Sequence, residues 1–199
     1  MNDQTSRRTY HHGALVEAVL DEVERIVEDD GLETVSLRAC AKRVGVSHSA
    51  LFRHFSDKRH VLTAFAIRSA HRMAHAIEQK VAKAEPGEKF LAAGLAYIDY
   101  AMRNPGPFRV VFREDVIEPT DLDYRQAMDK LGACLAIGGH GGGNDLSLGP
   151  KALLAWASVH GIATLHVDGS LSRDVSEDRL ESLIEETLRQ LSPILKPSA

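Results

Sequence analysis

The segment that most restricts how this chain folds is SLRACAKRVGVSHSALFRHFSDK, residues 36–58. Its apolar residues recur at helical spacing on both sides of Gly45, and a serine precedes each run, at Ser36 and at Ser47. Serine is a favoured N-cap, and glycine supplies the left-handed backbone that a tight turn between helices needs. The pattern therefore predicts two short helices joined by a tight turn, with one face buried.

The outward positions of this segment are basic. From Ser36 to His60 there are six lysines or arginines (Arg38, Lys42, Arg43, Arg53, Lys58 and Arg59) against one acid, Asp57. The whole chain, in contrast, carries a formal charge of −4. An ordinary solvated helical hairpin would mix its charges, as residues 17–30 do. A basic helix pair on an acidic protein indicates DNA binding.

The rest of the chain shows helical periodicity and no credible pairing of strands. The expected helices are one lined by Leu15–Val27 and ended by Gly31, one from Ser56 to Lys83, and others over 88–103, 108–112, 121–137, 150–167 and 177–196. We therefore expect an all-α protein. Residues 1–60 would hold an N-terminal tail and a three-helix unit with the helix-turn-helix, and residues 61–199 a helical bundle.

The last two expected helices have different apolar patterns. Residues 150–167 are apolar all round after Lys151, so this helix must be covered on all sides, and Ala157 and Gly161 allow another helix to approach closely. Residues 177–196 carry a stripe of leucines and one isoleucine, which offers an adjacent second surface. Paired across a two-fold axis, the two helices of each subunit predict a four-helix homodimer interface.

Large aromatic side chains with polar tips are concentrated in the C-terminal bundle. The candidates for a small-molecule pocket are Tyr97, Tyr100, Phe108, Phe112, Tyr124, Trp156 and His160. Aromatic walls with a few polar tips are typical of ligand pockets between bundle helices. His160, one helical turn after Trp156, is the favoured polar contact, although a core histidine held by internal hydrogen bonds fits the pattern equally well.

The remaining motifs favour neither a metal nor a catalytic site. His71 and His75 lie one helical turn apart, but no cysteine or acid at a matching spacing completes a metal site. The sequence HGGG at 140–143 lacks the Gly-x-Ser-x-Gly turn that esterase chemistry needs. We therefore expect a flexible linker over 138–145, no enzyme activity and no cofactor.

The sequence also gives no indication of secretion or of a membrane span. Residues 1–12 are polar, and the longest uncharged apolar segment, 152–167, is shorter than the ~20 residues of a membrane span. Cys40 and Cys134 match no zinc spacing and are typical of reduced thiols, although a role for either in sensing oxidants stays open. We expect a cytoplasmic protein without a membrane partner.

The run GLETVSLRACAKRVGVSHSALFRHFSDKRHVL, within residues 12–67, resembles the DNA-binding domain of the TetR family of bacterial transcriptional regulators. Residues 156–161, WASVHG, are similar to the Trp–His–Gly signature of one subgroup of that family. The resemblance implies an all-helical homodimer in which an effector bound in the C-terminal domain changes the separation of two helix-turn-helix units. The function expected is a ligand-responsive regulator, most simply a repressor, on an inverted-repeat operator of double-stranded DNA. The alternative is a DNA-binding regulator without a small-molecule ligand, acting constitutively or through a protein partner.

The resemblance also implies roles for individual residues. It places Arg38 near the DNA backbone and within reach of a base, and it directs Arg53 to the major groove. His54 and Lys58 would hold phosphates. The full predicted DNA-binding set is Ser36, Arg38, Ser47, His48, Ser49, Arg53, His54 and Lys58. The family usually has tyrosine where this chain has Phe52, so a hydroxyl contact to phosphate is lost there.

Overall fold

A computed structural model of the chain describes residues 4–135, 149–171 and 175–195. Every regular element within these residues is a helix, so the predicted all-α class is confirmed. The elements are α1 (Gln4–Asp29), η1 (Leu32–Thr34), α2 (Leu37–Val44), α3 (His48–Leu51), α4 (Lys58–Val81), η2 (Pro86–Glu88), α5 (Lys89–Arg103), α6 (Pro105–Val111), α7 (Leu122–Leu135), α8 (Pro150–Val167) and α9 (Glu177–Leu195). None of the helices in this part of the chain has the length and apolarity that a membrane span requires.

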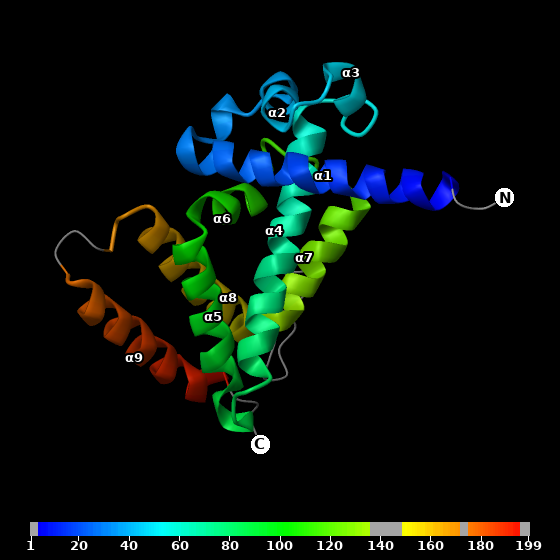
Figure 1. Cartoon of the computed structure of the whole chain (residues 1–199). Coiled ribbons are helices and arrows are strands. Elements are labelled where there is room, and N and C mark those ends of the chain that lie inside the picture. Colours follow the sequence, from blue (N-terminus) through cyan, green and yellow to red (C-terminus); the bar gives the residue numbers. More distant parts are fainter. Residues whose placement is uncertain (1–3, 136–148, 172–174, 196–199) are drawn as a thin grey trace.

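The helices form two groups that meet along α4. In Figure 1, α2 and α3 lie at one end of the molecule above α1, and α4 runs from this end past α1 into the lower bundle. There α4 packs against α5, α6 and α7, while α8 and α9 pack on α5. The predicted division at residue 60 falls in the first turn of α4, so this one helix carries the connection between the two groups.

The local geometry around α2 and α3 follows the predicted capping pattern. The hydroxyl of Ser36 accepts a hydrogen bond from the Ala39 backbone N–H at 3.1 Å, and that of Ser47 accepts one from Ala50 at 3.2 Å. Gly45 ends α2 with φ of 77°, in the left-handed region where a side chain would be strained. The two caps and the glycine turn are therefore confirmed.

One predicted helix begins earlier than expected, and one predicted segment falls outside the described residues. The short helix predicted at 108–112 begins earlier, at Pro105, because proline is well suited to the first turn of a helix, where its missing N–H costs no hydrogen bond. The predicted linker at 138–145 lies outside the described residues.

The centre of the predicted α9 stripe packs within one chain. Leu180, Ile184 and Leu188 are buried within their own chain, and α9 packs on α5. A Cβ on Gly94 of α5 would lie 3.0 Å from Leu188 Cδ1, which shows how closely the two helices approach. The apolar surface of α5 lies under this stripe in the same chain. Sequence periodicity shows that a helix has an apolar face, but it does not show whether that face packs within one chain or against a second copy.

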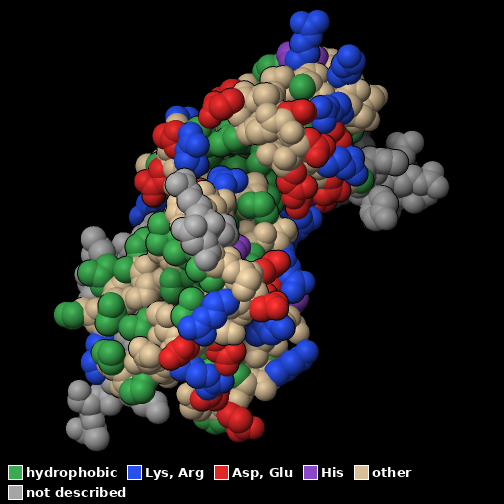
Figure 2. Space-filling view, turned by 90° about the vertical axis from the view of Figure 1, so that its left-hand side faces the viewer, with side chains coloured by type: hydrophobic (Ala, Val, Ile, Leu, Met, Phe, Trp, Pro, Cys, Tyr) green, Lys and Arg blue, Asp and Glu red, His purple; other side chains and the backbone are tan. Residues whose placement is uncertain are grey.

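The described residues cover helix α8 on one side. Its buried residues, Ala152, Ala155, Val159 and Ala163, all lie on the face toward the bundle. The opposite face leaves Leu153, Leu154 and Leu165 exposed. Figure 2 shows hydrophobic side chains gathered over one side of the lower domain, beside an area of mixed charges. The described part of one chain therefore leaves part of the apolar surface of α8 uncovered, and its cover by a second copy stays a prediction.

Candidate nucleic-acid interface and ligand cavity

Helices α2 and α3 present a compact basic surface. Arg38, Lys42 and Arg53 are exposed and form no ion pair or hydrogen bond with the described residues. His48 and Ser49 are also exposed, whereas Leu51 and Phe55 turn inward and are buried. Three uncompensated cations around a short polar helix are suited to the negative charge and grooves of a duplex.

The other three cations of the segment have partners within the protein. Arg43 forms ion pairs with Glu22 at 3.1 Å and with Asp30 at 2.8 Å, both on or just after α1. Arg59 donates hydrogen bonds to the backbone carbonyls of Asp115 and Ile117. The basic surface is thus narrower than the count of residues in the sequence indicates.

Lys58 has a structural task that the sequence does not reveal. Its ammonium group donates to the backbone carbonyls of Leu32 at 3.1 Å and Glu33 at 2.9 Å, and the side chain is half-buried. Because an ammonium has three N–H groups, one remains for another acceptor. The predicted phosphate contact of Lys58 stays a prediction.

The predicted serines and His54 lie at the same end of the molecule. Ser36 and Ser47 use their hydroxyls as caps, and the Ser49 hydroxyl lies 3.1 Å from that of Ser47. His54 is half-buried in the turn after α3. Their contacts with DNA stay predictions.

Phe52 is an apolar residue on this surface. It is 45% exposed, and its ring meets that of His48 edge to face, with 4.4 Å between ring centroids and an interplanar angle of 75°. The surface therefore pairs one exposed aromatic ring with one of the predicted base-facing residues.

In the lower bundle a small cavity of about 10 Å³ lies between α5, α7 and α8. Three of the predicted pocket residues, Tyr97, Phe112 and Trp156, line it together with Met128, Leu131, Gly132 and Leu135 of α7, and their contact with a ligand stays a prediction. Of the α7 residues, Leu131, Gly132 and Leu135 were not predicted, because helical spacing is their only signal in the sequence. The lining contains no charged side chain, and the space admits about one water molecule, so a larger ligand must displace side chains.

His160 lies beside this cavity at the centre of an aromatic cluster. Its ring stacks on Trp156, with 4.9 Å between centroids and 6° between planes, and it also contacts Phe108 and Phe112. Its Nδ1 lies 2.8 Å from the Tyr97 hydroxyl, and its Nε2 lies 3.5 Å from Thr164 Oγ1. Both contacts are satisfied by the neutral tautomer that carries its proton on Nε2.

Burial sets the protonation of this pair. It lowers the pKa of His160 and raises that of Tyr97 far above its usual value. Both groups are therefore neutral at pH 7, and they share one hydrogen bond in apolar surroundings.

Two of the predicted pocket residues, Tyr100 and Tyr124, lie outside this cavity and bond to the backbone. The Tyr100 hydroxyl donates to the Ser69 carbonyl at 3.2 Å, and the Tyr124 hydroxyl donates to the Val111 carbonyl at 2.9 Å. Burial raises the pKa of each phenol to about 12. Neither residue lines the cavity, because each ring packs into a helix–helix contact where a backbone carbonyl takes its polar tip.

Helix α6 connects the aromatic cluster to α1. Its Phe108 and the C-cap residue Phe112 contact His160. Its Arg109 donates to the Val167 carbonyl at the end of α8 at 2.6 Å. At its other end a Cβ on Gly106 would lie 2.9 Å from Val27 Cγ1 on α1. Helix α6 thus contacts both the residues around the cavity and α1, the helix on which α2 packs.

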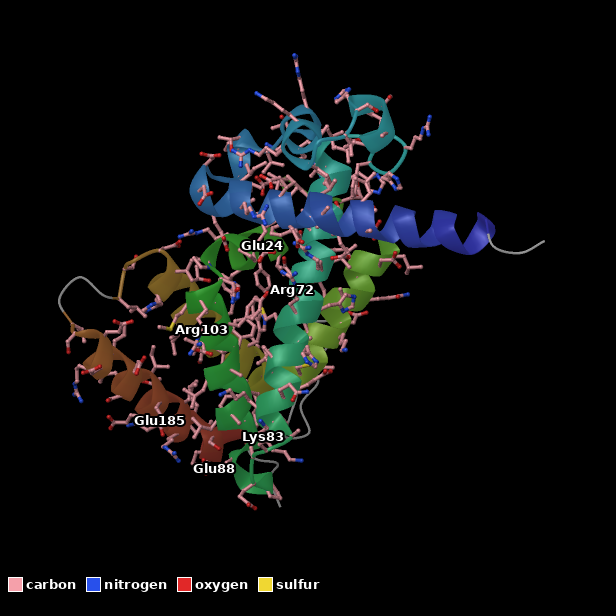
Figure 3. All side chains as sticks on the ribbon, viewed as in Figure 1. Glu24, Arg72, Lys83, Glu88, Arg103 and Glu185 are labelled. Carbon is pink, nitrogen blue, oxygen red and sulfur yellow. The ribbon has the colours of Figure 1, made fainter. Side chains whose placement is uncertain are left out.

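A second connection joins α1 to α4. Arg68 of α4 pairs with Glu17, Asp21 and Glu24 of α1 at 3.3, 2.6 and 2.8 Å. Arg72, one helical turn after Arg68, pairs with Glu24 at 2.7 Å. Figure 3 shows Arg72 and Glu24 between α4 and α1. These ion pairs add to the contacts that join α1 to α4.

The described residues contain no group of three His, Cys, Asp or Glu side chains placed to hold a metal ion. His71 and His75 are both exposed on α4. Cys40 and Cys134 are buried free thiols, and burial raises the pKa of each.

Comparison with known proteins matches two family models. Residues 19–65 match "Bacterial regulatory proteins, tetR family", and residues 90–191 match "Tetracyclin repressor-like, C-terminal domain". A curated relative, described as the uncharacterized HTH-type transcriptional regulator YobS of Bacillus subtilis (strain 168), is 22% identical over 86% of this chain and 87% of its own.

Solved structures are similar to this chain in fold. A protein of unknown function from Rhodococcus sp. RHA1 is 27% identical, with a TM-score of 0.72 over 94% of this chain and 98% of that one. A TetR family transcription regulator from Marinobacter aquaeolei VT8 is 14% identical, with a TM-score of 0.64 over 92% and 97% of the two chains, a likeness of fold.

Proposed function

Since the chain belongs to the tetR family of bacterial regulatory proteins, we propose that it is a ligand-responsive repressor that binds an inverted-repeat operator as a cytoplasmic homodimer. The family binds DNA and regulates transcription, and its members are not enzymes. The observation that carries the ligand response is a pair of contacts made by α6: Phe108 and the C-cap residue Phe112 contact His160, and Gly106 packs closely against Val27.

Ligand response follows from the small size of the cavity. A molecule larger than water can occupy this space of about 10 Å³ only if lining side chains move, and Phe112 and Trp156 are two of them. Phe112 is the C-cap of α6, so displacement of Phe112 also moves α6. Helix α6 packs against α1 so closely at Gly106 that a Cβ there would lie 2.9 Å from Val27 Cγ1. Closely packed elements shift as units, so α1, α2 and α3 change position relative to the bundle. The ligand thereby favours one orientation of the DNA-binding surface.

The homodimer is supported by the outer face of α8. Leu153, Leu154 and Leu165 are exposed there, and no side chain lies within 4 Å of a Cβ built on Gly161 in the same helix. Exposed leucines around a glycine, which has no side chain to keep another helix away, are suited to close packing against α8 of a second copy. Ile194 of α9, also exposed, adds apolar surface. The proposed interface is therefore centred on α8, without the α9 stripe.

A two-fold axis through α8 gives the dimer two DNA-binding surfaces. Recognition helices of such dimers enter successive major grooves about 34–36 Å apart. An operator read by two identical surfaces has to be an inverted repeat. Arg38, Lys42 and Arg53 of each copy supply the positive charge, which makes the affinity salt-dependent.

Selection of bound fragments from the source genome tests the DNA part of this proposal. We expect an enriched inverted repeat with half-sites centred one helical turn apart. Enrichment of sites without two-fold symmetry would contradict the homodimer.

Thermal-shift screening against small uncharged aromatic compounds tests the ligand part, because a bound ligand raises the melting temperature by mass action. A compound that raises it should also release the operator. His160→Leu keeps the bulk of the side chain but loses its polar tip, so this variant should keep its operator affinity and lose the response. If no compound shifts the melting temperature, the alternative of a regulator without a small-molecule ligand is favoured.

A further inference from the structure

The exposed face of α3 and its following turn contains one residue whose chemistry differs from the others. His48, Ser49 and Arg53 are polar, whereas Phe52 is a phenyl ring that is 45% exposed. The core beneath is already filled by Leu51 and Phe55, which are 0% and 2% exposed. Phe52 is therefore not needed to complete the core, and its exposed area is available for another contact.

The ring of Phe52 is held in a defined position. It follows His48 by one helical turn, and the two rings meet edge to face with 4.4 Å between centroids. Edge-to-face pairs at this distance are favourable. The contact thus fixes an apolar ring next to a side chain with hydrogen-bonding nitrogens, on the surface that carries Arg38, Lys42 and Arg53.

We propose that Phe52 determines sequence specificity by packing on the 5-methyl group of a thymine in the major groove, beside the base pair that His48 contacts. The thymine methyl is the apolar group that base edges present in the major groove, and apolar side chains read it by contact. A phenyl ring has no hydrogen-bond donor for a phosphate oxygen, so it gains less from a contact with the sugar–phosphate backbone than from a contact with the thymine methyl group. The inference rests on the proposed DNA binding by this surface, and the count of two sensitive thymines rests on the proposed inverted repeat; neither requires the ligand.

Single thymine replacements test the inference with the full-length protein. The preferred duplex is first selected from random sequences, and each thymine is then replaced by deoxyuridine, which lacks only the methyl group. We expect one thymine in each half-site at which replacement weakens binding about four-fold, the effect of leaving one methyl-sized group unburied. Replacing both should weaken binding roughly 15-fold, because distant sites add.

Two substitutions assign this effect to Phe52. Phe52→Ala should bind thymine and deoxyuridine duplexes equally, and Phe52→Leu, which keeps an apolar contact, should retain part of the discrimination. Arg53→Ala is the matched control, since it should bind more weakly while keeping the full sensitivity to deoxyuridine. Melting temperatures of the variants confirm that they are folded.

The inference would be overturned if wild type showed no sensitive thymine, or if Phe52→Ala lost the same affinity for both duplexes, as expected for a contact to the sugar–phosphate backbone. Selection that enriched no duplex at all would instead contradict sequence-specific binding itself.

Discussion

The imidazole Nδ1 of His160 lies 2.8 Å from the hydroxyl oxygen of Tyr97, and both rings are enclosed by aromatic side chains. Since burial lowers the pKa of His160 and raises that of Tyr97, the neutral forms of both are stabilised together. This polar contact lies against the wall of the cavity formed by Tyr97, Phe112 and Trp156. It therefore links the stability of the bundle to the site where we propose that the ligand binds.

The His160 pair makes stability depend on pH. The histidine pKa is lower in the folded than in the unfolded chain, so the unfolded chain binds the proton more readily. Its contribution to stability is complete above the unfolded pKa of about 6.5 and is lost as the pH falls through that value toward the folded pKa. In melting curves from pH 8 to 5, His160→Gln should lose less stability than wild type. His71→Gln, at an exposed position, is the control, and equal slopes in all three proteins would refute the assignment.

Gly106 is expected to be intolerant of a side chain. A Cβ there would lie 2.9 Å from Val27 Cγ1, a branched atom on α1 that cannot swing away. Gly106→Ala should lower the free energy of unfolding by about 1–3 kcal/mol and weaken operator binding, because α6 is pushed from α1. Gly87→Ala is the control, since nothing lies within 4 Å of its Cβ position. Urea denaturation measures both, and a Gly106→Ala variant as stable as wild type would show that α6 and α1 move apart without cost.

Three cations of the basic segment should have distinct effects. Arg53→Ala should weaken operator binding by about 1–3 kcal/mol and relax the preference at one base step. Lys42→Ala should weaken binding to all sequences alike and reduce the salt slope by about one. Lys58→Ala should also lower the melting temperature, because the carbonyls of Leu32 and Glu33 lose their donor. Binding isotherms at several salt concentrations separate these effects, and an unchanged base preference for Arg53→Ala would make that residue a phosphate contact.

The two thiols should react slowly in the folded protein. Cys40 and Cys134 are buried, and burial raises the pKa of each, which reduces the thiolate fraction at pH 8. Titration with a disulfide reagent should detect two thiols in urea and a much slower reaction without it. Rapid reaction of either cysteine in the native protein would revive a role in sensing oxidants.

The elements that the sequence predicted well are those determined locally. Ser36, Gly45 and Ser47 act through bonds within a few residues, so their pattern identified the caps and the turn. The outer face of α8 follows from the same kind of reasoning, because a helix apolar all round exceeds what one small bundle covers.

What the sequence did not reveal depends on contacts between distant segments. Arg43 and Lys58 look like free surface cations until α1 and η1 bring Glu22 and the carbonyl of Leu32 to them. Tyr100 and Tyr124 look like pocket residues until their hydroxyls meet backbone carbonyls 31 and 13 residues away. Periodicity identifies a face but not which helix covers it.

The account depends most on the dimer centred on α8, and sedimentation velocity at micromolar concentration tests it directly. Wild type should sediment with twice the 21.8 kDa of one chain. Gly161→Glu should sediment as a folded monomer. The Cβ position of Gly161 is open within one chain, so the fold tolerates the side chain, but the glutamate would place a charge in the proposed α8 interface. Leu122→Glu, at a leucine of α7 that is 66% exposed, should remain dimeric. A monomeric wild type, or a Gly161→Glu variant that stays dimeric, would contradict the account.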